Sequence, residues 1–166
     1  PLTSSAASDV YKRQVYKSDL HSYKELPLRY FEFGSVYRYE KTGVLHGLLR
    51  LRGFTQDDAH IFCTKDQIND EVKTLLSFSV KLLGSYGLTE IEADLSTKPK
   101  KYIGSDSDWD NATSSLKQSL TELGVPYQTA DGEGAFYGPK IDLHAKDAIG
   151  RSCLLYTSDA ADDVNG

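Results

Sequence analysis

The alternation of side chains in residues 54–63 constrains the fold of this chain more than any other feature. The stretch, FTQDDAHIFC, puts four side chains that can contact a ligand at every second position: Phe54, Gln56, Asp58 and His60. Side chains two residues apart share one face of a β-strand. The aromatic and β-branched run at residues 30–39 predicts a preceding strand. We expect the two strands to pair antiparallel across the glycine-containing loop between them.

Two interpretations of this polar face remain open on the residues alone. A buried core face would not combine an amide, a carboxylate and an imidazole, because each needs a polar partner away from water. A solvent face would accommodate all three without any function. A pocket face would present them, beside the ring of Phe54, to a bound molecule.

The rest of the chain predicts an α+β fold. Residues 64–87 show the apolar spacing of an amphipathic helix, with Thr64 as its N-cap and Gly84 or Gly87 at its end. Residues 88–97 alternate as a strand, and residues 106–124 predict a second helix closed by Gly124. Residues 125–150 predict a strand, a glycine-rich turn and another strand. Helices laid on an antiparallel sheet give the α+β class.

The two ends of the chain differ in pattern from its middle. Residues 4–14, SSAASDVYKRQ, match a translation of a transposase sequencing adapter, and residues 153–163, CLLYTSDAADD, match its reverse complement. We therefore expect residues 1–14 and 153–166 to be adapter-derived and disordered, and residues 15–152 to be a partial domain. Natural low-complexity tails are the alternative.

Composition excludes several classes of protein. The net charge of -5 argues against binding nucleic acid through overall charge, although a local basic site remains compatible with it. No apolar run reaches the roughly 18 residues of a membrane span, and no secretory signal is evident. Two cysteines are too few for a disulfide scaffold, which favours a reducing, cytoplasmic setting.

Three further stretches carry candidate ligand-binding residues. Arg38 and Glu40 share a strand face in YRYE, either as a surface ion pair or as a cation for phosphate beside a carboxylate for an exocyclic amine. Arg50 lies in LRLRG, either on a solvated edge or at a phosphate. In DGEGAFYGPK, residues 131–140, the glycines serve a turn, or they bring Tyr137 and Lys140 close to a ligand.

These stretches together resemble the class II aminoacyl-tRNA synthetases. FEFGSVYRYEKTGVLHGLLRLRGFTQDDAHIFC, residues 31–63, is similar to the second signature motif of that family. LSTKP, YIGSDSDWD and GEGAFYGPKID are similar to later segments of its threonyl-tRNA synthetase branch. The resemblance covers nearly all of residues 15–151, in the family's order and spacing.

The resemblance implies an incomplete class II catalytic core and a parent protein that is a threonine–tRNA ligase. Such a ligase uses ATP with Mg²⁺ to convert threonine to threonyl-adenylate, and then transfers threonine to tRNA(Thr). The third signature motif and the anticodon-binding and editing domains lie outside the similarity. We therefore expect this chain to be inactive alone, and its parent to be a homodimer.

The resemblance also implies a role for each candidate residue. Arg38, as the catalytic residue, would hold the α-phosphate of ATP and the amino-acid carboxylate. Glu40 would accept from the adenine amine, Arg50 would reach the γ-phosphate, and Phe54 would stack on adenine. Four residues would bind or approach the amino acid: Gln56, Asp58, Tyr137 and Lys140.

His60 would be one ligand of a Zn²⁺ ion. Zinc that binds the hydroxyl of threonine would reject valine far better than an apolar pocket can. The other two protein ligands fall outside the similarity, so we expect the zinc site to be incomplete. A prolyl-type or other class II synthetase, or a non-catalytic synthetase-like paralogue that serves as a binding module, remains an alternative.

Overall fold

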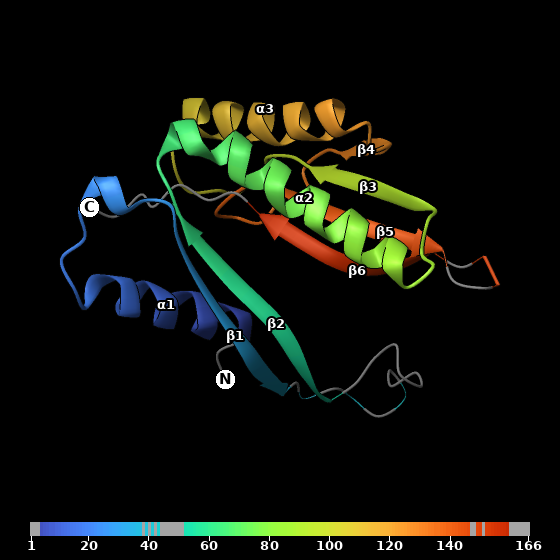
Figure 1. The fold of residues 1–166 in the computed structure, drawn as a ribbon, viewed down its shortest axis with the longest axis horizontal. Coiled ribbons are helices and arrows are strands. Elements are labelled where there is room, and N and C mark those ends of the chain that lie inside the picture. The colour runs from blue at the N-terminus through green and yellow to red at the C-terminus, as the bar shows by residue number, and fades with distance from the viewer. Residues whose placement is uncertain are drawn as a thin grey trace. The chain divides into compact units, whose positions relative to one another are not determined.

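The computed structural model describes residues 4–37, 39, 41, 43, 52–146, 149–150 and 152–159, with the backbone alone at residues 4–10, 156 and 159. The chain divides into two compact units, Pro1–Thr64 and Lys65–Gly166. Figure 1 shows the helices and strands of each. Each unit is described by itself.

The first unit contains a two-stranded antiparallel sheet. Strand β1 (Leu28–Tyr37) pairs with β2 (Gly53–Phe62) along their whole length, so the predicted strand pair is confirmed. Burial alternates residue by residue along β1 and along β2 as far as His60, after which Ile61 and Phe62 are both partly buried. One face is half-buried, and the other exposes large rings: Phe31, Phe33 and Tyr37.

A helix precedes this sheet where we expected disorder. Helix α1 runs through Ser4–Lys17, and the 3₁₀ turn η1 (Tyr23–Glu25) follows it. Tyr16 stacks on Phe62 of β2, with ring centroids 4.3 Å apart. Lys12 is buried against the same strand pair. These contacts account for a helix in a segment whose sequence lacks helical periodicity.

The second unit is a four-stranded mixed sheet with two helices. Its elements are η2 (Lys65–Gln67), α2 (Ile68–Ser85), β3 (Ile91–Ser96), α3 (Asp106–Leu123), β4 (Tyr127–Ala130), β5 (Lys140–Lys146) and β6 (Ser152–Asp159). The strand order is β4-β3-β5-β6. The α+β class is confirmed. The glycine-rich segment is not a hairpin turn, because β4 pairs parallel with β3 and β5 pairs antiparallel with the other side of β3.

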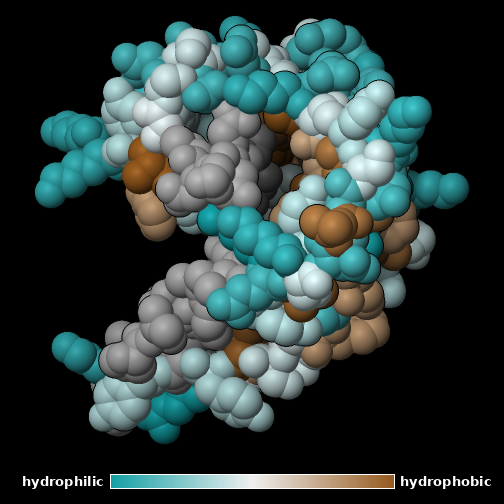
Figure 2. Space-filling model, turned by 90° about the vertical axis from the view of Figure 1, so that its left-hand side faces the viewer, coloured by the Kyte–Doolittle hydropathy of each residue, from teal (hydrophilic) through white to brown (hydrophobic). Residues whose placement is uncertain are grey.

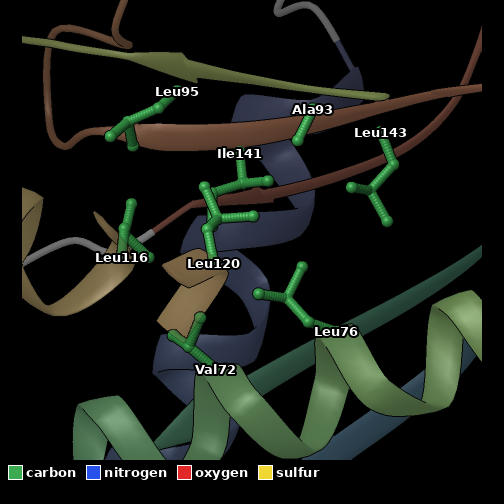
Figure 3. Close-up of a cluster of buried hydrophobic side chains, with 8 residues drawn as sticks. All are labelled: Val72, Leu76, Ala93, Leu95, Leu116, Leu120, Ile141 and Leu143. Carbon is green, nitrogen blue, oxygen red and sulfur yellow. The ribbon is translucent and has the colours of Figure 1, made fainter. Parts of the chain in front are cut away.

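The core of the second unit lies between the sheet and its helices (Figure 3). Each of four elements contributes a pair of buried side chains: Val72 and Leu76 of α2, Leu116 and Leu120 of α3, Ala93 and Leu95 of β3, Ile141 and Leu143 of β5. Figure 1 shows α2 and α3 beside one another on one side of this sheet. The opposite side of β5 therefore carries its polar residues.

The helix ends agree with the sequence at α3 and differ at α2. Ser105 caps α3 by accepting a hydrogen bond from the backbone of Asp108, and Gly124 closes it with a φ of 65°, as predicted. The prediction of Thr64 as N-cap is wrong. The turn η2 intervenes, and α2 begins after Gln67, whose side chain makes no cap hydrogen bond.

The C-terminal segment also differs from the expected disorder. Residues of β6 pair antiparallel with β5, with a register shift between Leu143 and His144. An unpaired edge of β5 would leave backbone donors and acceptors available, and β6 satisfies them.

None of the described helices is long and apolar enough to cross a membrane.

Candidate functional site

The half-buried face of the hairpin gathers the polar residues predicted from the period of two. Four cross-strand pairs form it: Val36 with Phe54, Gly34 with Gln56, Glu32 with Asp58, and Tyr30 with His60. All four β2 residues of these pairs are partly buried. The structure therefore places an aromatic ring, an amide, a carboxylate and an imidazole in one row, and adds the carboxylate of Glu32 beside Asp58.

Lys12 of α1 lies between the two carboxylates. Its Nζ donates to Glu32 Oε1 at 2.6 Å and also to Asp58 Oδ2. The Lys12 side chain is only 3% exposed. Burial by itself lowers the pKa of Lys12, but the hydrogen bonds to Asp58 and Glu32 outweigh it and raise that pKa above its ordinary value of 10.5. The single positive charge of Lys12 thus offsets part of the repulsion between the two carboxylates.

His60 lies beside Asp58 on the same strand. Its Nδ1 is 3.8 Å from Asp58 Oδ1. A tightly held zinc ion needs three or four protein ligands. Within the described part of the chain, no group of three or more His, Cys, Asp or Glu side chains could hold a metal ion. The described residues therefore do not fit a complete zinc site, and no step below depends on zinc.

This row of groups suits a small polar molecule. The Asp58 carboxylate can accept from a hydroxyl or an amine, Gln56 can both donate and accept, and Phe54 offers a flat face for stacking. Lys12 now uses one oxygen of Asp58. A ligand hydroxyl would compete with this ammonium group for the same carboxylate.

Three predicted residues lie outside the described residues: Arg38, Glu40 and Arg50. The remaining two, Tyr137 and Lys140, belong to the second unit. Tyr137 makes an edge-to-face contact with Phe136, with ring centroids 5.1 Å apart. Lys140 Nζ lies 2.5 Å from Asp142 Oδ2.

Sequence reasoning missed two acids that contact the candidate residues. Glu32 opposes Asp58, and the antiparallel register of the hairpin was the signal that could have found it. Asp142 is buried beside Lys140, and its position two residues further along the same strand was the available signal.

The family of tRNA synthetase class II core domains (G, H, P, S and T) matches residues 5–156 of this chain. The curated threonine–tRNA ligase of Sulfurihydrogenibium sp. (strain YO3AOP1) is 55% identical over 138 residues, which are 83% of this chain and 22% of the relative. That of Geobacter sp. (strain M21) is 56% identical over 137 residues, 82% of this chain and 21% of the relative. The chain spans about a fifth of the length of these relatives.

Two solved structures share the fold. The RNA binding domain of threonyl-tRNA synthetase from Cryptosporidium parvum Iowa II superposes with a TM-score of 0.80 at 43% identity, over 86% of this chain and 36% of that one. A putative threonyl-tRNA synthetase from Aeropyrum pernix has a TM-score of 0.77 at 29% identity, over 95% of this chain and 37% of that one.

Proposed function

The chain belongs to the family of tRNA synthetase class II core domains, and from this premise we propose that it is part of the catalytic domain of a threonine–tRNA ligase. The observation that carries the proposal is the half-buried row Phe54, Gln56, Asp58 and His60 on β2. The family covers several amino acids, so the family alone does not select threonine. The identity of about 55% to threonine–tRNA ligases supports that choice.

The reaction of the whole protein would join threonine and ATP, with Mg²⁺, into threonyl-adenylate and then transfer threonine to tRNA(Thr). Arg38 would neutralise charge at the α-phosphate as the threonine carboxylate attacks it. Glu40 would accept from the adenine amine, Arg50 would hold the γ-phosphate, and Phe54 would stack on adenine. Such chemistry needs positioning and charge stabilisation more than it needs a proton-transfer residue.

Asp58 and Gln56 would select the amino acid. A site that accepts a hydrogen bond from the substrate hydroxyl rejects valine, because valine would leave the carboxylate of Asp58 without that partner. Tyr137 and Lys140 are further proposed substrate-binding residues, and His60 would supply a zinc ligand alongside ligands from elsewhere in the whole protein. We further propose that the parent protein is cytoplasmic and homodimeric, and that residues 15–152 of this chain derive from it.

The 166-residue chain would not activate threonine by itself. It spans about a fifth of the length of its relatives, and Lys12 already donates to one oxygen of the carboxylate that would bind the threonine hydroxyl. Threonine-dependent pyrophosphate exchange by the purified chain would contradict this expectation.

A segment exchange tests the proposed activity. Residues 15–152 replace the matching segment of the Aquifex aeolicus threonine–tRNA ligase, to which this chain is 54% identical over 143 residues. We expect the chimera to catalyse ATP–pyrophosphate exchange with threonine, and to reject valine and proline. A folded chimera that prefers proline, or that exchanges with none of these amino acids, would refute the assignment.

The matched control is the same chimera with Asp58→Ala. Loss of the hydroxyl acceptor should lower kcat/KM for threonine by about a hundredfold or more, while the chimera keeps its melting temperature within a few degrees. An unchanged kcat/KM would remove Asp58 from the proposed site.

A further inference from the structure

Lys140 and Asp142 lie two residues apart on β5, so their side chains share one face of the second sheet. The side chains of Ile141 and Leu143 point to the other face, into the core (Figure 3). Strand β5 lies between β3 and β6 and is paired along both of its edges. The backbone beneath the two charged side chains is therefore held on either side by a neighbouring strand.

The carboxylate of Asp142 is buried, and both of its oxygens have partners. Asp142 is only 7% exposed. Its Oδ2 accepts a hydrogen bond from Lys140 Nζ at 2.5 Å, and its Oδ1 accepts one from the hydroxyl of Thr157 at 2.7 Å. A buried carboxylate needs such partners, because it has lost its contacts with water. One hydrogen bond to each oxygen also fixes the orientation of the carboxylate group.

This pair differs from ion pairs on the solvated surface. Figure 2 shows many hydrophilic residues on one face of the molecule. Ion pairs between fully solvated side chains are screened and contribute little. In the pair on β5, the side chain of Lys140 is 28% exposed and that of Asp142 is 10% exposed. A ligand in solution therefore reaches the lysine more readily than it reaches the acid.

An ammonium group can bind Asp142 and a ligand at the same time. It has three N–H donors, of which Asp142 uses one. The other two can donate to an anionic oxygen of a ligand. A long lysine side chain loses much rotamer freedom when it is immobilised. The hydrogen bond to Asp142 has already restricted this freedom, and such preorganisation strengthens binding.

We propose that Asp142 is a positioning residue, which holds the ammonium group of Lys140 in place to bind an anionic oxygen of the substrate. The inference rests on the proposed function, in which Lys140 binds substrate. The alternative is an ion pair that only stabilises the sheet. The two differ in one respect: a positioning residue acts through Lys140, so its effect on the reaction disappears when Lys140 is replaced.

Kinetics of the chimera from the segment exchange test this dependence. Lys140 and Asp142 both lie within residues 15–152, so the chimera contains the pair. Asp142→Asn should lower kcat/KM for threonine in aminoacylation of tRNA(Thr) by about tenfold, because a hydrogen bond between charged groups is lost. Asp142→Glu should recover part of this loss, because it restores the carboxylate.

A double-variant cycle separates the positioning role from a structural one. Lys140→Gln should lower kcat/KM at least as much as Asp142→Asn does. Adding Asp142→Asn to Lys140→Gln should cause no further loss, because nothing then remains to be positioned. Losses that multiply in the double variant would overturn the proposal, as would an unchanged kcat/KM in Lys140→Gln.

Asp94→Asn is the matched control. Asp94 lies directly opposite Asp142 on β3, so the substitution removes the same charge from the same face of the sheet. Its partner is different, because His144 Nε2 lies 3.1 Å from Asp94 Oδ2. Asp94→Asn should leave kcat/KM unchanged. A loss equal to that of Asp142→Asn would assign the effect to the general negative charge of this face and overturn the proposal.

A second measurement uses the 166-residue chain and needs no activity. The ammonium protons of Lys140 should exchange slowly with water, since they donate to a buried acid, and should give a side-chain NMR signal that Lys140→Gln removes. Asp142→Asn should abolish this signal, and Asp94→Asn should retain it. Retention of the signal in Asp142→Asn would overturn the proposal. Circular dichroism would verify that each variant is folded. Failure of the segment exchange and failure here are distinguishable, because the NMR signal does not depend on catalysis.

Discussion

At the scale of single residues, Lys12 affects both the stability of the hairpin and the availability of the Asp58 carboxylate to a ligand. It is nearly fully buried and contacts both Glu32 and Asp58, which lie opposite each other on paired strands. Removal of one member of such a group leaves the other charges without compensation. The stability of the hairpin and the access of a ligand to Asp58 therefore depend on the same ammonium group.

Lys12→Met should lower the free energy of unfolding of the first unit by about 1–3 kcal/mol. This loss is smaller than for a fully buried ion pair, because the Glu32 and Asp58 side chains are partly exposed to solvent. Urea unfolding followed by tyrosine fluorescence would measure it. Adding Asp58→Asn to Lys12→Met should recover part of the loss, because one carboxylate then no longer repels Glu32. No loss in the single variant would show that solvent screens these charges.

Gly134→Ala should destabilise the second unit by about 1–3 kcal/mol, since its Cβ atom would meet the carbonyl oxygen of Thr97 at 2.5 Å. Gly84→Ala is the matched control. Its Cβ would meet nothing within 4 Å in α2, and it should stabilise the chain by about 0.5–1 kcal/mol. Chemical denaturation of both variants would test the opposite signs.

At the scale of elements, ion pairs link α2 to α3 and anchor the start of α3. Lys73 of α2 pairs with Glu122 of α3, and Lys98 pairs with Asp106 in the first turn of α3. The hydrogen bond from Lys73 holds the pKa of Glu122 below 4.5, and the hydrogen bond from Lys98 holds the pKa of Asp106 below 3.8. The folded state therefore favours the ionised form of both acids.

A carboxyl group with a lowered pKa in the folded state stabilises the fold above its unfolded pKa, and this stabilisation is lost as the pH falls through the folded pKa. Stability of the second unit should therefore be constant from neutral pH to about pH 5 and then decrease on further acidification. Urea midpoints measured across this range would test it. Glu122→Gln should show a shallower decrease than the parent chain, and an equal decrease would assign the acid sensitivity to other groups.

The sequence predicted the strands β1 to β5 and the helices α2 and α3, but neither η2 nor β6. It also predicted the shared face of β2, because the period of two depends only on local backbone geometry. It did not predict that β4 and β5 lie on opposite sides of β3, because strand order depends on contacts between distant segments. It also did not predict the helical structure of residues 4–14 in α1, where packing of Lys12 outweighs a weak local pattern.

At the scale of the whole chain, the two units differ in how much apolar surface they bury. Val36 is the buried apolar residue of the first unit within the described ranges, whereas the second unit buries a cluster of eight. Burial of apolar surface is the main source of stability. A two-stranded sheet with little burial is marginally stable in water.

Hydrogen–deuterium exchange should therefore protect the amides of β3 and β5 more strongly than those of β1 and β2. Urea unfolding should show two transitions, with the first unit unfolding at the lower concentration. Leu120→Ala, a buried core change expected to cost about 2–5 kcal/mol, should shift only the upper transition. A single shared transition would mean that the two units unfold together.

The order of strands in the second sheet has a consequence for synthesis on the ribosome. Strand β3, α3 and β4 follow one another in the chain, so they can assemble as soon as residue 130 has emerged. Ile141 and Leu143, two of the eight buried residues of the core, arrive only with β5. Until then the nascent chain exposes the apolar sides of α2 and β3, and a chaperone would bind this exposed surface.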